Sequence, residues 1–150
     1  MSLHNARSIA NWFMAWAGDV EEADISNLKI QKLLYYAQGE HYAETGQPLF
    51  SDDFQAWAHG PVVPSVYRDL KKWQGSPIDV DEELPDDFDW SDYRDVEEEL
   101  LKVWNTFGIY SAWTLRNMTH TEAPWRDAFS SDNRNVVISK DAIKSFFTRG

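Results

Sequence analysis

The sequence predicts a mainly α-helical fold, a compact bundle of about six or seven helices with a short extended or β-like segment near residues 54–58. Three observations support this prediction. Apolar residues recur at helical spacing along most of the chain, residues 47–64 lose that spacing, and the 150 residues include eight Trp, six Tyr and eight Phe but no cysteine. Because a buried aromatic side chain removes about 150–250 Å² from water, this chain can form a core without disulfides. We therefore expect a single domain over residues 1–150.

The first two expected helices are long. In the first, over residues 6–18, Ile9 and Trp12 begin an apolar stripe that continues at helical spacing. The second begins near Ser26, a favoured N-cap residue, and ends near Gly46, which can adopt the left-handed conformation of a helix end. Since the second helix is apolar on several sides, we expect it at the centre of the bundle.

The helical spacing disappears between residues 47 and 64. The Gly60-Pro61 pair breaks any helix there, and residues 54–58 are predicted to be extended. Pro64 suits the first turn of a third helix, because the amide hydrogen that proline lacks would have no partner at that position.

The segment after the third helix is strongly acidic. Residues 79–99 contain twelve acids and one base, Arg94, and so account for the net charge of −11. Residues 74–90 also contain Gly75 and two prolines, which predicts a loop or a poorly ordered excursion. An acidic surface repels nucleic acids and anionic lipids, so we expect neither as a partner. The expected acidic surface comprises Asp79, Asp81, Glu82, Glu83, Asp86 and Asp87.

Basic residues on two neighbouring helices allow two interpretations. They form either a modest basic face or part of an ordinary solvated helix surface, and the sequence favours the solvated surface. The residues concerned are Lys29, Lys32, Arg68, Lys71 and Lys72.

Apolar spacing and capping residues predict four further helices in the second half of the chain. The longest runs from residue 91 or 92 to residue 107, before Gly108. Ser111 caps a short helix, and a turn at residues 119–125 opens another short helix that ends at residue 129. Ser139 caps the last helix, whose inner face is expected to bury Ile143, Phe146 and Phe147.

No catalytic or metal-binding motif is present in the sequence. The histidines, at positions 4, 41, 59 and 120, lack the helical spacing of metal ligands, and without cysteine we expect no metal site and no other cofactor. A nucleophile elbow and a phosphate-binding glycine loop are also missing. The acidic loop should be solvated and ionised rather than catalytic. One enzymatic alternative stays open, in which His59 and His120, each beside a proline turn, line one pocket with shifted pKa values.

The sequence carries no signal for export or membrane insertion. The first seven residues lack the apolar run of a signal peptide, and no stretch approaches 18 uninterrupted apolar residues. The lack of cysteine fits a reducing compartment. We therefore expect a cytoplasmic protein.

Three sequence blocks resemble the Panacea domain family, whose members occur in antitoxins of toxin–antitoxin systems and in phage-associated proteins. Together the blocks span about residues 25–130. The first block, residues 28–39, contains the run Leu33-Leu34-Tyr35-Tyr36-Ala37-Gln38. The second contains Pro48-Leu49-Phe50, Ala56-Trp57, Gly60-Pro61-Val62 and Val66-Tyr67, and the third contains Leu115, Thr119-His120 and Pro124-Trp125.

The resemblance implies a helical domain that neutralises a partner toxin by direct contact, with the toxin encoded by a neighbouring gene. The host would be a bacterium or a phage-infected cell, and the protein would not be an enzyme. A proteolytic adaptor, which delivers a bound protein to an ATP-dependent protease, is the alternative within this resemblance.

We expect the partner to bind at the aromatic corner around Gly60-Pro61. Trp and Tyr dominate interface hot spots, and loops display side chains that helices would bury. A toxin acting on RNA or DNA often has a basic face, which the acidic segment would attract. The expected partner-binding residues are Trp57, His59, Gly60, Pro61, Val62, Tyr67, His120 and Trp125.

Overall fold

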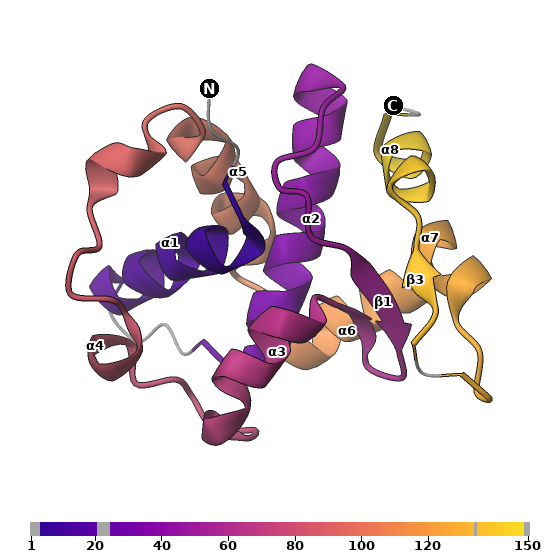
Figure 1. The fold of residues 1–150 in the computed structure, drawn as a ribbon, viewed down its shortest axis with the longest axis horizontal. Helices are drawn as coiled ribbons and strands as arrows, with labels where there is room; N and C mark the ends of the chain where they lie inside the picture. Colours follow the sequence, from indigo (N-terminus) through magenta and orange to yellow (C-terminus); the bar gives the residue numbers. More distant parts are fainter. Residues whose placement is uncertain (1–3, 21–24, 134, 149–150) are drawn as a thin grey trace.

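The computed structural model describes residues 4–20, 25–133 and 135–148 (Figure 1). Over these residues the chain forms eight α-helices, two short 3₁₀ helices (η1 and η2) and one small antiparallel sheet. The prediction of a mainly α-helical fold with a short extended segment is therefore confirmed. Among the same residues, no helix combines the length and the apolar character that a membrane span requires.

Helix α1 (Ala6–Asp19) begins where the sequence predicts. The Asn5 side chain accepts a hydrogen bond from the Ser8 amide at 2.7 Å, and Ser8 Oγ accepts one from the Asn5 amide at 3.2 Å. This reciprocal capping box satisfies two amides that the helix itself leaves without a partner. Ile9 and Trp12 of the apolar stripe are buried as predicted, and Trp12 stacks on the half-buried Trp16 with 5.6 Å between ring centroids.

Helix α2 (Asn27–Thr45) lies at the centre of the molecule, as its apolar character predicts (Figure 1). Helices α1, α5, α6 and α8 all pack against it. Gly46 ends the helix with φ +74°, in the left-handed region. Gly39 permits the close approach of α8 (Lys140–Thr148), because a Cβ atom at this position would lie 2.2 Å from the ring of Phe147.

The predicted extended segment is strand β1 (Phe54–Trp57), the middle strand of a sheet with the order β2-β1-β3. Strand β2 (Gly60–Val62) returns antiparallel after a two-residue turn, and β3 (Val137–Ile138) pairs with the other edge of β1. Neither partner strand is predicted from the sequence. Both are three residues or shorter, and β3 pairs with a segment about eighty residues earlier, so no local pattern reports them.

The segment between α3 (Pro64–Leu70) and α5 (Glu97–Phe107) is more structured than the sequence predicts. Ile78 is buried, and its amide donates to the Ile25 carbonyl at 2.8 Å. This contact attaches the segment to the residues just before α2. The segment contains three short helical turns, η1 (Lys71–Trp73), α4 (Val80–Glu83) and η2 (Trp90–Tyr93).

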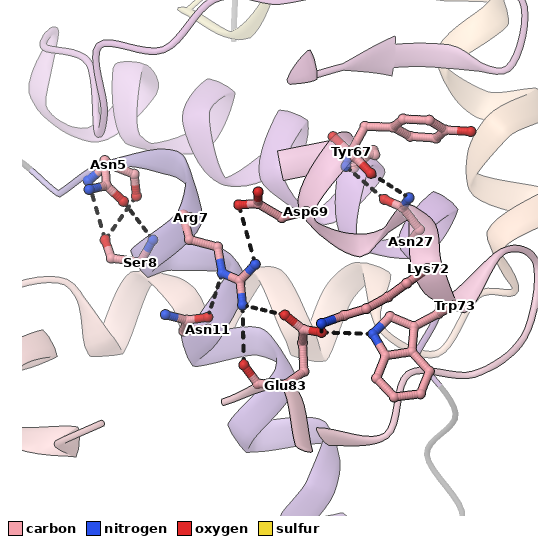
Figure 2. Close-up of polar contacts among 11 residues, drawn as sticks. Asn5, Arg7, Ser8, Asn11, Asn27, Tyr67, Asp69, Lys72, Trp73 and Glu83 are labelled. Carbon is pink, nitrogen blue, oxygen red and sulfur yellow. Dashed lines mark hydrogen bonds and ion pairs between the residues drawn. The ribbon is translucent and has the colours of Figure 1, made fainter. Parts of the chain in front are cut away.

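Glu83 fixes this segment to the rest of the fold (Figure 2). Its carboxylate accepts hydrogen bonds from Arg7 Nη2 at 2.8 Å and from Trp73 Nε1 at 2.8 Å, and Lys72 Nζ lies 3.0 Å away. Burial alone would raise the pKa of Glu83, but the hydrogen bonds from Arg7, Trp73 and Lys72 outweigh burial and lower it. The Glu83 side chain is only 6% exposed, so its expected place on the acidic surface is wrong.

Helix α5 begins at Glu97, five or six residues later than predicted. The Asp89 side chain caps η2 instead, accepting from the Ser91 amide at 2.9 Å, and Tyr93 turns inward to donate to the Ser8 carbonyl at 2.8 Å. Val96, with φ −126° and ψ −4°, separates η2 from α5. The acidic character of residues 91–96 therefore belongs to a separate turn.

Helices α6 (Ala112–His120) and α7 (Ala123–Ala128) match the predicted short helices. The caps at Ser111 and Ser139 are also as predicted, since the serine hydroxyls accept from amides three residues later at 3.1 and 3.0 Å. Helix α8 differs from the prediction at one side chain of its expected inner face. Phe146 does not join the core but lines a hollow beside Pro124 of α7.

Candidate functional site

The β1–β2 turn rests on the buried side chain of Lys32. Lys32 Nζ donates to the Pro61 carbonyl at 3.0 Å, and its side chain is fully buried. Gly60 has φ +110°, and a Cβ atom there would lie 2.6 Å from Lys32 Cε and 2.8 Å from Thr119 Oγ1. Helices α2 and α6 and the strand turn therefore meet at a point where only glycine fits. These contacts join residues from all three blocks that resemble the Panacea domain.

The burial of Lys32 overturns both interpretations of this residue, because it lies neither on a basic face nor on a solvated helix surface. Burial, and then the positive charge of Arg116, lower the pKa of Lys32 from its ordinary value of 10.5 to about 7. Within the described residues, no carboxylate forms an ion pair with this lysine. Its neighbours in sequence gave no clear signal of this burial, because the same run also contains the polar residues Lys29 and Gln31.

Two buried amides of α2 hold the neighbouring chain segments. Gln31 Oε1 accepts from the Val63 amide at 2.9 Å, and its Nε2 donates to Asn27 Oδ1 at 2.9 Å. Asn27 Nδ2 in turn donates to the Tyr67 carbonyl at 3.1 Å (Figure 2). This chain of hydrogen bonds fixes the start and the first turns of α3 against α2, so the aromatic ring of Tyr67 is displayed from a rigid support.

On the other side of the turn, His120 and Trp125 form a stacked pair. Their ring centroids lie 3.9 Å apart with an angle of 3° between the planes, and Trp125 Nε1 donates to the Trp57 carbonyl at 2.7 Å. Burial lowers the pKa of His120, and the charges of Arg116, Lys32 and His59 lower it further. A hydrogen bond with the Ala58 backbone opposes this shift. The pair thus packs against the end of β1, to which Trp125 is hydrogen-bonded.

A buried carboxyl group lies beside two tyrosines of α2. Tyr36 Oη donates to Glu122 Oε2 at 2.8 Å. Burial raises the pKa of Glu122, and the neighbouring hydroxyl groups of Tyr36 and Tyr35 oppose this shift. Burial and the Glu122 charge raise the pKa of both tyrosines. The sequence analysis did not single out Glu122, although its place one residue before Ala123-Pro124-Trp125 made it the N-cap residue of α7.

Two hollows open on the surface on either side of an aromatic pair. Trp57 and Tyr67 pack edge to face with 5.0 Å between ring centroids. The Phe129 hollow, about 680 Å³, is bounded by these two residues, Phe129 and the loop that follows it. The Trp113 hollow, about 540 Å³, is bounded by the same pair, the first turn of α2 and Trp113. His59 lines both hollows.

The eight expected partner-binding residues therefore divide into two groups. His59 is exposed, Trp57 and Tyr67 are half-buried, and all three line the hollows. Val62 borders the Trp113 hollow but is only 2% exposed. The others, Gly60, Pro61, His120 and Trp125, support the corner from within.

The sequence analysis missed that Trp113, 58% exposed, and Lys71 complete the hollows. The available signal was a tryptophan two residues after the Ser111 cap, in the first turn of a short predicted helix.

Neither of these two hollows is lined by both histidines of the enzymatic alternative. His59 faces both hollows, whereas His120 lies in the stack beneath β1 and borders neither of them. Across the described ranges, no three His, Asp or Glu side chains come together in an arrangement that could hold a metal ion.

Five of the six residues expected to form an acidic surface are exposed, namely Asp79, Asp81, Glu82, Asp86 and Asp87. They lie at the N-cap of α4, on α4 itself and in the segment that follows it. Figure 1 shows that this segment runs past α1, on the opposite side of the molecule from the strands.

Comparison with known proteins identifies the family. The family model described as "Antitoxin SocA-like, Panacea domain" matches residues 30–126. The chain is also 33% identical over 135 residues to the antitoxin SocA of Caulobacter vibrioides (strain NA1000 / CB15N), a match that covers 81% of this chain and 68% of that protein. No solved structure matches it significantly. The contacts around Lys32, Gly60 and Thr119 thus lie within the matched residues, and the chain belongs to the SocA-like Panacea domain family.

Proposed function

We propose that this protein is an antitoxin that neutralises a partner toxin by direct contact, in the cytoplasm of a bacterium or of a phage-infected host. The observation that most supports this proposal is the family match over residues 30–126, together with the antitoxin name of the relative that shares 33% identity. The contact surface would be the face that carries Trp57, His59 and Tyr67. These side chains stand on a buried hydrogen-bonded support, so little conformational entropy would be lost when a partner covers them.

The acidic segment would have a second role in this proposal. Its exposed carboxylates lie on another side of the molecule from the aromatic corner and are concentrated in residues 79–99. A strip of one charge accelerates association with an oppositely charged surface and contributes less to the lifetime of the complex. We expect the association rate constant with a basic toxin to fall as ionic strength rises.

Co-expression with the product of the adjacent gene tests the proposal. That product should be toxic alone, should be harmless together with this chain, and should co-purify with it. A product that is harmless alone, or that never co-purifies, would count against the antitoxin role.

A host lacking its ATP-dependent proteases separates direct contact from delivery to a protease. Neutralisation that persists in this host supports direct contact. Neutralisation that is lost, while the two proteins still co-purify, assigns the chain to the adaptor alternative.

A further inference from the structure

The two hollows are basic, although the protein is acidic. The chain carries 25 Asp and Glu against 14 Lys and Arg, yet the described residues that line the Phe129 and Trp113 hollows include no acid. Arg68 borders the Phe129 hollow, and Lys71 borders both. The charges of Arg68 and Lys71 make the hollows a local region of positive potential.

The cations that face the hollows are the ones without an ion pair. Lys72, next to Lys71, is paired with Glu83 at 3.0 Å, and Asp69, next to Arg68, is paired with Arg7 at 3.4 Å. These paired side chains point towards α1 and α4 (Figure 2). In contrast, Arg68 and Lys71 form no ion pair with any residue that the structure describes. Two charges are therefore available to a ligand in the hollows.

The walls of the hollows are aromatic. Trp57 and Tyr67 separate the two hollows, and Phe129 and Trp113 lie at their far sides. The Trp113 ring carries the Arg116 guanidinium on its face at 4.3 Å and is still 58% exposed. Such rigid, partly exposed aromatic rings provide large contact areas for an apolar side chain.

We propose that the two hollows form one docking groove for a segment of the partner protein in which an apolar side chain is flanked by carboxylates. The apolar side chain packs against Trp57 and Trp113, and the carboxylates pair with Arg68 and Lys71 through charge-assisted hydrogen bonds. This inference rests on the proposed function for the source of the segment. It adds the chemistry of the segment, which is opposite to that of the basic surface that the acidic strip would attract.

The charge balance favours a peptide over a nucleic acid in this groove. Basic grooves with aromatic rings also bind single strands, but those sites follow a charged backbone over several nucleotides. Here two unpaired cations lie in a chain of net charge −11, which repels a polyanion. A peptide with two carboxylates matches the available charge.

A random-peptide display selection against the whole chain tests the groove without knowledge of the partner. We expect the enriched peptides to carry Asp or Glu beside an aromatic or aliphatic residue. Enriched peptides should bind the R68E/K71E double variant at least about tenfold more weakly. The K144E/K102E double variant makes the same change in charge at exposed lysines outside both hollows and should retain binding. Circular dichroism checks that each variant is folded.

A charge swap completes the test. Peptides whose acids are replaced by lysine should bind R68E/K71E better than they bind the wild-type chain. The inference is overturned if no peptide is enriched, if the enriched peptides are neutral or basic, or if binding is the same in R68E/K71E. Tighter binding of a single-stranded oligonucleotide than of any peptide overturns it as well. So does a dimer of this chain that R68E/K71E dissociates, because a second copy would then occupy the groove.

These outcomes are distinct from those of the proposed function. If wild-type chain and R68E/K71E neutralise and co-purify with the adjacent gene product equally well, the groove inference fails and the antitoxin role stands. If the selection succeeds but the adjacent product is harmless alone, the groove stands and the antitoxin role fails.

Discussion

Replacing Lys32 with methionine tests whether one buried amine makes the stability of this fold depend on pH. Lys32 is fully buried, and its Nζ donates to the Pro61 carbonyl at 3.0 Å. Burial and the Arg116 charge lower its pKa from 10.5 to about 7. Methionine has a similar length and no charge, so the K32M variant loses the hydrogen bond and the titrating group together.

The sign of the effect follows from proton binding. Between pH 7 and 10.5, Lys32 binds more protons in the unfolded chain than in the folded chain, so its contribution to the free energy of unfolding rises with pH in this window. One pKa unit corresponds to about 1.4 kcal/mol, so the wild-type protein should gain about 2 kcal/mol over K32M between pH 7 and pH 9. The raised pKa values of Tyr35 and Tyr36 have the opposite effect, but only above the ordinary tyrosine value of 10.

Urea unfolding followed by tryptophan fluorescence at pH 7, 8 and 9 measures this difference. The matched control is Lys144→Met, at an exposed position on α8. The difference between its free energy of unfolding and the wild-type value should be the same at all three pH values. A difference between the wild type and K32M that is the same at pH 7 and pH 9 would refute the reasoning, because Lys32 would then hold its proton equally in both states.

Three other substitutions probe the supports of the fold. Glu83→Gln should lower the free energy of unfolding by about 1–3 kcal/mol at neutral pH. Because hydrogen bonds keep the pKa of Glu83 in the folded protein below 4.5, this difference should shrink as the pH falls below 4.5. Urea unfolding at neutral pH and at a pH below 4.5 measures the change. Gly60→Ala should lower the free energy of unfolding by at least about 2 kcal/mol, because Gly60 has φ +110° and the added methyl group would lie 2.6 Å from a carbon of the buried Lys32. Thermal unfolding measures this loss. The control Gly75→Ala, whose methyl group would meet nothing within 4 Å, should unfold at the wild-type temperature. Trp125→Phe should cost about 1 kcal/mol, measured in the same way, through loss of its hydrogen bond to the Trp57 carbonyl; an unchanged stability would show that this bond contributes nothing.

Local sequence signals predicted most of the helices. Caps at Ser26, Ser111 and Ser139 and the left-handed Gly46 act within one turn of the chain, so a reader of the sequence can find them. The strand pairs could not be predicted in this way. Strand β3 is two residues long and depends on β1, so its formation is decided by packing between distant segments rather than by its own composition.

The position of the candidate site could be predicted from the sequence, but which of the charged residues are buried could not. The aromatic corner at Trp57 and Tyr67 followed from the motif and from loop position. By contrast, a lysine in an α-helix has the same neighbours in sequence whether it is solvated or buried. Lys32 is buried because Gly60 and Pro61, about 28 residues later, cover it. In the same way, the Glu83 side chain is not part of the acidic surface, because it binds Arg7, which is 76 residues earlier in the sequence.

The position of β3 and α8 has a consequence for synthesis of the chain on the ribosome. Among the described residues, strand β1 gains its second neighbour from Val137–Ile138, and the Phe147 ring of α8 packs over Gly39 of α2. A nascent polypeptide therefore cannot complete this sheet, or the packing of α8 on α2, until residues 137–147 have been synthesised. Until then the side of the aromatic interior that these residues cover stays open to chaperones and proteases.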